Sequence, residues 1–123
     1  MNKPLNWFEI PAVDLGRAKA FYERILGVTL REERMGPNAM AVFPYDRDQA
    51  TGGCVLQGQG STPSRDGVVI YLNAGDSLDD VLNRTLAAGG EIAVPKTPLP
   101  PGMGVIAHVI DTEGNRIGLH AMG

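Results

Sequence analysis

Residues 7–27 read WFEIPAVDLGRAKAFYERILG, and this stretch carries the signals that decide the fold. Residues 7–13 alternate well enough to predict a strand, and Asp14 then supplies the N-cap of a helix. Gly27 predicts the end of this helix, because glycine is common just beyond a helix C-terminus. Between cap and stop, apolar residues recur on one helical face: Leu15, Ala18, Tyr22, Ile25 and Leu26.

Three β-like runs follow this helix, at residues 28–34, 39–45 and 52–57. The first half of the chain therefore reads βαβββ. A segment rich in Gly, Ser and Pro comes next, with the composition of a linker or loop.

The second half repeats the same plan. Its predicted elements are a strand at 68–73, a helix that begins after Asp76 or Ser77, and strands at 91–94, 105–110 and 116–121. Leu15 and Leu78 are 63 positions apart, and so are Gly27 and Gly90. The equal spacing of helix start and helix stop indicates an internal duplication.

The bulk properties suit one domain, because the chain has 123 residues and 43% hydrophobic content. We place a first module at 1–58, a linker at 59–66 and a second module at 67–123. A formal charge of −3 argues against a nucleic-acid partner. No apolar run approaches the roughly 20 residues that span a bilayer. We therefore expect no membrane partner and a cytoplasmic location.

The order Val13-Asp14-Leu15, Arg17-Ala18, Phe21-Tyr22 and Leu26-Gly27 resembles the opening of the vicinal oxygen chelate superfamily. This superfamily includes glyoxalases, extradiol dioxygenases and bleomycin-resistance proteins, and residues 111–119 resemble its closing hairpin. The resemblance implies an α+β fold, in which two tandem βαβββ modules form a half-open, curved mixed sheet around a cavity. It also implies that chains of this length pair into homodimers.

The resemblance also implies a metal site with one ligand from each of four strands, typically His, Gln or Glu. The positions that correspond here are Trp7, Val69, Gly118, and Leu56 or Gln57. Indole, isopropyl and hydrogen side chains offer no donor atom to Zn, Ni or Fe. We therefore expect no metal cofactor, and keep a divalent metal only as a lesser alternative.

Alternation along the strands indicates which side chains face the cavity, because residues two apart share a face. Trp7 and Glu9 are expected to face it, while Phe8 and Ile10 pack against the helices. The same rule turns Val69, Tyr71 and Asn73 inward on one strand, and Arg116, Gly118 and His120 on another. The loop 97–104 is expected to cross the mouth of the pocket. The ligand-binding candidates are Trp7, Tyr71, Met103, Arg116 and His120.

Glu9 is the candidate catalytic residue, since a carboxylate in a partly dry cavity is suited to general acid or base chemistry. The alternative is that Glu9 pairs with Arg116 or another cation and only stabilises the sheet. His108 lies on an apolar strand, where a structural role is expected. Asp111 and Glu113 are expected to be turn residues.

The leading interpretation is a glyoxalase/bleomycin-resistance-like protein that binds a small organic molecule in a metal-free cavity. A second interpretation is a metal-independent isomerase or lyase, in which Glu9 is the general acid or base and acts with Tyr71 or His120. A third is a metal-dependent glyoxalase or dioxygenase with rearranged ligands, which would be Glu9, Gln57, His108 and His120. A purely structural role is the remaining option.

Overall fold

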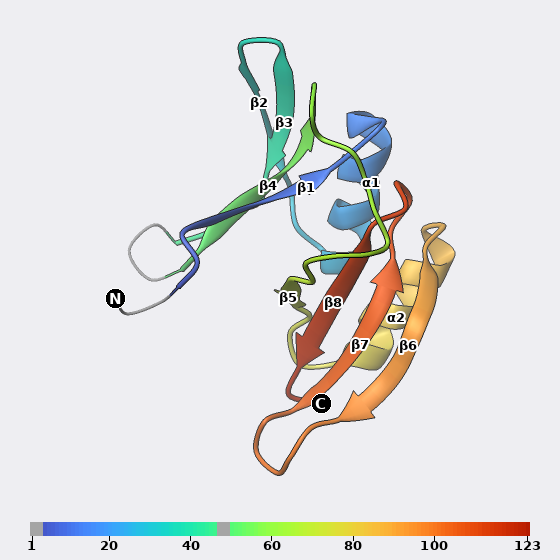
Figure 1. Ribbon diagram of the computed structural model, residues 1–123. Coiled ribbons are helices and arrows are strands. Elements are labelled where there is room, and N and C mark those ends of the chain that lie inside the picture. The colour runs from blue at the N-terminus through green and yellow to red at the C-terminus, as the bar shows by residue number, and fades with distance from the viewer. Residues whose placement is uncertain (1–3, 47–49) are drawn as a thin grey trace.

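The computed structural model describes residues 4–46 and 50–123, and within them two four-stranded sheets and two helices (Figure 1). The first five elements are β1 (Trp7–Pro11), α1 (Leu15–Leu26), β2 (Arg31–Met35), β3 (Asn38–Val42) and β4 (Gly52–Gln57). The next five are β5 (Tyr71–Asn73), α2 (Leu78–Ala87), β6 (Glu91–Pro98), β7 (Val105–Ile110) and β8 (Arg116–Ala121). No helix in the described part of the chain is long and apolar enough to cross a membrane.

The two sheets have equivalent topologies. Their strand orders are β1-β4-β3-β2 and β5-β8-β7-β6. In each sheet one pair is parallel, β1 with β4 and β5 with β8, and the other neighbours are antiparallel. Two open mixed sheets built on one plan confirm the predicted α+β fold of tandem βαβββ modules.

Helix α1 begins and ends where the local signals predict. The Asp14 side chain accepts a hydrogen bond from the Arg17 N–H at 3.0 Å. Gly27 adopts the left-handed conformation, with φ of 67°, and its N–H bonds the Glu23 carbonyl. The predicted stripe is buried at Leu15, Ala18, Tyr22 and Ile25.

Helix α2 confirms the predicted start but not the predicted stop. Ser77, rather than Asp76, is its N-cap, so Leu15 and Leu78 are both first helical residues. The helix ends at Ala87, and Gly89 is the glycine with positive φ, so the prediction of Gly90 as the stop was wrong. Gly90 is needed for space instead: a Cβ there would lie 2.9 Å from Cε1 of Phe21.

Several strand boundaries differ from those expected. Strand β2 starts at Arg31 rather than at residue 28, and β6 continues to Pro98 through register shifts rather than ending at residue 94. Strand β5 covers only Tyr71–Asn73, because the Arg116 N–H bonds the Ser64 carbonyl at 3.2 Å. The segment before β5 thus fills the ladder position that a longer strand would occupy.

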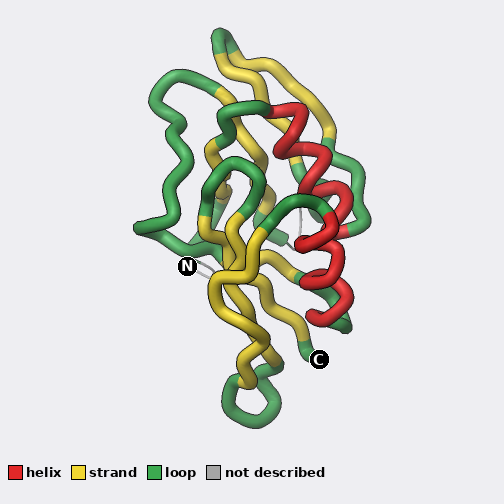
Figure 2. Tube along the Cα trace, turned by 90° about the vertical axis from the view of Figure 1, so that its right-hand side faces the viewer, coloured by secondary structure: helices red, strands yellow, loops and turns green. Residues whose placement is uncertain are grey.

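One hydrophobic core joins both modules. It includes Ile10, Tyr22 and Ile25 from the first module and Leu78 and Leu119 from the second. Both helices lie on the same side of the molecule (Figure 2). Each helix end receives an arginine from the other: Arg24 donates to the Ala87 carbonyl and Arg84 to the Ile25 carbonyl, both at 3.1 Å. Cations at carbonyl ends also suit the helix dipoles.

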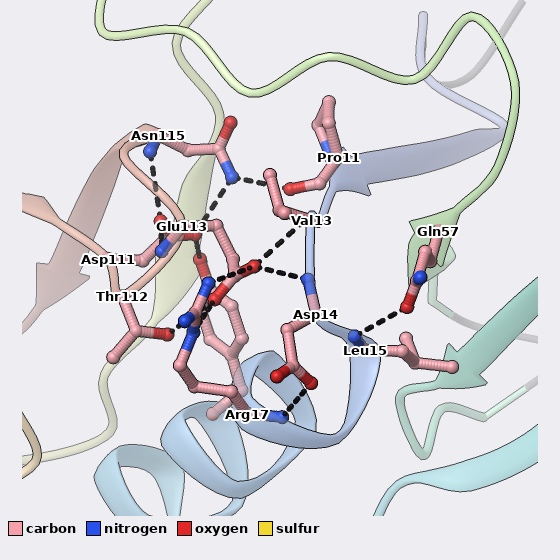
Figure 3. A network of polar contacts seen from close by, with 11 residues as sticks. Pro11, Val13, Asp14, Leu15, Arg17, Gln57, Asp111, Thr112, Glu113 and Asn115 are labelled. Atoms are coloured by element: carbon pink, nitrogen blue, oxygen red, sulfur yellow. Dashed lines mark hydrogen bonds and ion pairs between the residues drawn. The ribbon is translucent and has the colours of Figure 1, made fainter.

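A polar cluster on the β7–β8 turn holds the two modules together (Figure 3). The Glu113 carboxylate accepts hydrogen bonds from the backbone N–H groups of Val13 at 2.8 Å and Asp14 at 2.7 Å. Arg17 adds an ion pair at 2.6 Å, although the Glu113 side chain has 0% exposure. Burial raises the pKa of Glu113, but donors from Arg17, Asp14, Thr112 and Val13 outweigh burial and hold that pKa below its ordinary value.

The same turn makes four further hydrogen bonds. Asp111 accepts from the Tyr22 hydroxyl at 2.5 Å and from the backbone N–H groups of Glu113 and Asn115. Asn115 donates through Nδ2 to the Pro11 carbonyl at 2.7 Å. Burial and the nearby Asp111 charge raise the pKa of Tyr22 well above its ordinary value, so its hydroxyl remains a donor. The predicted turn residues therefore also bind the junction between β1 and α1.

We predict that Glu113→Gln lowers the free energy of unfolding by about 2 kcal/mol at neutral pH, since it removes a buried, charge-assisted set of hydrogen bonds. Denaturant titration measures this loss. Because the folded pKa of Glu113 is depressed, its stabilisation is present above the ordinary pKa of 4.5 and is lost as pH falls through the lower folded value. The variant should therefore lose less stability than the wild type on acidification.

Glu32→Gln is the matched control, because Glu32 is exposed on β2. Its free energy of unfolding should stay within about 0.5 kcal/mol of the wild type. Equal effects of the two substitutions would contradict a special role for Glu113.

Candidate functional site

The predicted alternation places the candidate residues on the faces of the sheets that lie away from the helices. In β1, Ile10 is buried while Trp7 and Glu9 are exposed. In β5, Leu72 is buried between exposed Tyr71 and Asn73. In β8, Ile117 and Leu119 are buried, and Arg116 and His120 are half-buried. The sheet face on which Trp7, Glu9, Tyr71, Arg116 and His120 lie was therefore predictable from sequence.

Tyr71 and His108 form the centre of a polar cluster on the second sheet. The Tyr71 hydroxyl is 2.7 Å from Nε2 of His108, and the two rings meet edge to face with centroids 5.4 Å apart. Gly118 is paired with Tyr71 on one side and His108 on the other. A Cβ at Gly118 would lie within 2.4 Å of the Tyr71 ring. The glycine therefore gives the phenol ring the space in which it lies.

Arg116 completes this cluster. It donates through Nε to the Arg65 carbonyl at 3.2 Å and through Nη1 to Nδ1 of His108 at 3.4 Å. Burial, and after it the charge of Arg116, lowers the pKa of His108. Within residues 4–46 and 50–123 no ion pair joins Arg116 to Glu9, so that alternative role for Glu9 is not found.

His120 and Met103 meet at the far end of β8. Nε2 of His120 is 2.7 Å from the backbone carbonyl of Met103. Gly104 has φ of 88°, and a Cβ there would clash with the Ala121 carbonyl at 2.3 Å. The loop before β7 is thus attached to the end of β8, with the Met103 side chain 56% exposed.

Trp7 and Glu9 lie near Cys54 on the first sheet. Glu9 is paired in register with Cys54, and Trp7 meets Tyr45 edge to face at 5.9 Å. Burial and the charge of Glu9 raise the pKa of Cys54 to about 11, against an opposing hydrogen bond from Trp7. The thiol is buried and protonated, so it is a poor nucleophile.

A cavity of about 720 Å³ opens beside the Tyr71 cluster. Its lining is mainly apolar and includes Phe8, Phe43, Val69 and Tyr71. Neither Phe8 nor Phe43 was a candidate from sequence, and the alternation along the first strand predicted that Phe8 packs against the helices. Their rings are 5.6 Å apart, and the partial exposure of Phe8 to the cavity is a tertiary feature.

A second hollow, of about 220 Å³, is lined by Glu9, Asp66 and Arg116 among others. It shares Val68 and Ile70 with the larger cavity. Tyr71 therefore lines one space, and Glu9 and Arg116 line the neighbouring one. The remaining candidates, Trp7, Met103 and His120, line neither of these two spaces.

The residues at the implied metal positions do not fit a metal. Trp7, Val69 and Gly118 have no suitable donor, and Leu56 has none. Oε1 of Gln57 already accepts a hydrogen bond from the Leu15 N–H at 2.8 Å, at the start of α1. The chain therefore does not present the implied four-ligand set.

The rearranged ligand set is not assembled either. His108 is bonded to Tyr71 and Arg116, and His120 lies by the Met103 carbonyl. Among the residues that the structure describes, no group of three or more His, Cys, Asp or Glu side chains is placed to hold a metal ion.

Solved structures with the same fold include glyoxalases. A glyoxalase I variant from Zea mays superposes with a TM-score of 0.73 at 25% identity, over 97% of this chain and 46% of that chain. The chain thus spans about half the length of the maize enzyme. A glyoxylase/bleomycin resistance protein/dioxygenase domain from Frankia has a TM-score of 0.70 at 16% identity and covers 97% of both chains.

A family enzyme from Burkholderia phytofirmans superposes with a TM-score of 0.66 at 16% identity, over 98% of this chain and 100% of that chain. No curated protein sequence matches the chain significantly. The sequence profile of one family matches residues 4–119, which is nearly the whole chain. Together with the paired βαβββ sheets, this match shows that the chain belongs to the Glyoxalase/Bleomycin resistance protein/Dioxygenase superfamily.

Proposed function

We propose that this chain binds a small organic molecule in the cavity beside Tyr71, without a metal. The observation that carries the proposal is the combination of a largely apolar space of about 720 Å³ with the polar cluster of Tyr71, His108 and Arg116 at its side. Ligand pockets typically combine an apolar lining with a few polar groups that fix orientation. The missing donors at the implied metal positions favour such a ligand over a metal complex.

A homodimer is part of this proposal. Large apolar side chains lie exposed on the rim of the cavity, namely Leu5, Tyr45, Val68 and Tyr71. A contiguous exposed apolar patch is a common feature of a surface that binds another protein. A second copy that covers this rim would bury these side chains and help to enclose the ligand.

The cytoplasmic location stays a prediction.

A metal-independent isomerase or lyase is the second candidate. It is favoured by the position of Glu9 in the 220 Å³ hollow, beside Arg116 and without an ion pair among the described residues. A carboxylate with no fixed partner is available to move a proton of a ligand that enters this hollow. Two other proton carriers were proposed from sequence. Tyr71 lines the neighbouring cavity, which shares Val68 and Ile70 with this hollow. His120 lies at the far end of β8.

We predict that Val69→Trp abolishes the binding of organic fragments in the large cavity, because the indole fills space that Val69 borders. Fragment binding is measured by changes in amide chemical shifts of the cavity residues. Affinity should fall at least about tenfold, the change that 1.4 kcal/mol of lost binding produces. Val13→Trp is the control, since Val13 is exposed and does not line this cavity, and it should bind as the wild type does. Unchanged binding by Val69→Trp would exclude the cavity as the site.

The substitution Glu9→Gln distinguishes the proposed binding protein from the proposed isomerase or lyase. We expect every fragment that binds to be recovered unchanged after long incubation with the wild type, as followed by NMR of the fragment. We also expect Glu9→Gln to bind these fragments as the wild type does. Conversion of a fragment by the wild type and by Glu32→Gln, but not by Glu9→Gln, would establish the enzyme instead.

A further inference from the structure

His108 lies between two groups whose contacts fix where its hydrogen is. A guanidinium only donates hydrogen bonds, so the contact from Nη1 of Arg116 requires Nδ1 of His108 to accept. A neutral imidazole has a single N–H, which is then on Nε2. The Nε2–H group faces the Tyr71 oxygen at 2.7 Å and donates to it. The lowered pKa of His108 supports the neutral ring at neutral pH.

This arrangement leaves the hydroxyl hydrogen of Tyr71 free. The Tyr71 oxygen accepts from His108, and no acceptor for its own hydrogen is found in the described residues. Two contacts position the Tyr71 ring, which lies over Gly118 and against the His108 ring. Tyr71 is nevertheless 50% exposed, so a bound molecule can reach its oxygen.

This hydrogen belongs to a residue that lines the larger cavity. Tyr71 lines that cavity together with apolar side chains that include Phe8, Phe43 and Val69. Asn73 also lines it, but its Oδ1 already accepts from the Gly75 N–H at 2.8 Å. The complementary molecule has an apolar body and an end that accepts a hydrogen bond.

The charge of Arg116 indicates which acceptor is preferred. Arg116 has no ion-pair partner in the described part of the chain, and its positive charge lies directly behind His108. Arg116 borders the smaller hollow together with the carboxylates of Glu9 and Asp66, neither of which pairs with it among the described residues, and none of the three lines the larger cavity. A negatively charged oxygen is therefore favoured over a neutral one, since hydrogen bonds to ionised acceptors are the stronger ones.

We propose that Tyr71, oriented by His108 and Arg116, donates its hydroxyl hydrogen to a carboxylate oxygen of an apolar organic acid held in the larger cavity. The inference rests on the proposed function and adds to it the chemical class of the ligand. It also makes Tyr71 the contact residue, and His108 and Arg116 the positioning residues.

The first test needs no ligand. The chain has two histidines, so ¹⁵N spectra of the imidazole rings are assigned by comparison with His120→Gln. We expect His108 to be protonated on Nε2 at neutral pH, and Arg116→Leu to populate the Nδ1–H form while the amide spectrum stays folded. Arg65→Gln is the control, because the Arg65 side chain pairs with Glu91 and only its carbonyl contacts Arg116. A wild-type His108 protonated on Nδ1 would overturn the proposed orientation.

The second test measures ligand class with 2-naphthoate and its neutral isostere 2-naphthamide, both followed by amide chemical shifts. The wild type and Arg65→Gln should bind the acid about tenfold more tightly than the amide, as expected for a charge-assisted hydrogen bond. Tyr71→Phe keeps the ring over Gly118 but removes the donor, and should lose most of this preference. Arg116→Leu should lose it as well.

The outcomes separate the inference from the proposed function. If both probes bind in the cavity and are excluded by Val69→Trp, but acid and amide bind equally or Tyr71→Phe has no effect, the ligand class proposed here is wrong while the cavity remains the site. If neither probe nor any other fragment shifts the cavity residues, both the inference and the proposed function are wrong.

Discussion

A single buried carboxylate, Glu113, sets how the two halves of this molecule lie against each other. It sits on the last turn of the chain and binds the backbone that enters the first helix, together with Arg17 (Figure 3). An ionised group without exposed surface is tolerated only when its oxygens are fully bonded, and here backbone donors and a guanidinium meet that need. Asn115 binds the Pro11 carbonyl at the same junction, and Asp111 binds the Tyr22 hydroxyl on α1. The cavity between the modules depends on the position that these contacts fix.

Local sequence signals predicted most helices and strands. Where the observed structure differs from the prediction, the cause is a contact with a segment outside the element. Helix α1 follows from Asp14, the apolar stripe and Gly27, all within one stretch. Strand β5 is shorter than its apolar run because the Ser64 carbonyl, in the segment before the strand, accepts the Arg116 N–H that a longer β5 would bond. The hydrogen bonds of Glu113 to the start of α1 could not be predicted either. The sequence indicated that Glu113 lies in a turn, but it did not indicate a partner about a hundred residues away.

The sheet faces on which the candidate residues lie could be predicted from sequence, but the contacts among these residues could not. Alternation placed Tyr71 and Arg116 on the open side of the second sheet. It did not reveal that both bind His108, which was expected to be structural because its neighbours are apolar. The register of Gly118 beside His108 was the available signal, because an aromatic ring needs such a gap. The apolar cavity lined by Phe8 could not be predicted from local sequence, because segments of both modules form its lining.

The chain belongs to its superfamily by sequence and fold, and the ligand that we propose for it is an organic molecule in place of a metal. Elemental analysis of protein purified without chelators tests this claim most directly, paired with thermal-shift titrations of Zn, Ni, Mn and Fe(II). We expect metal far below one equivalent per chain and no saturable shift with any of the ions. Metal near one equivalent per chain, or a saturable shift, would contradict it and would show that other donors replace Trp7, Val69 and Gly118.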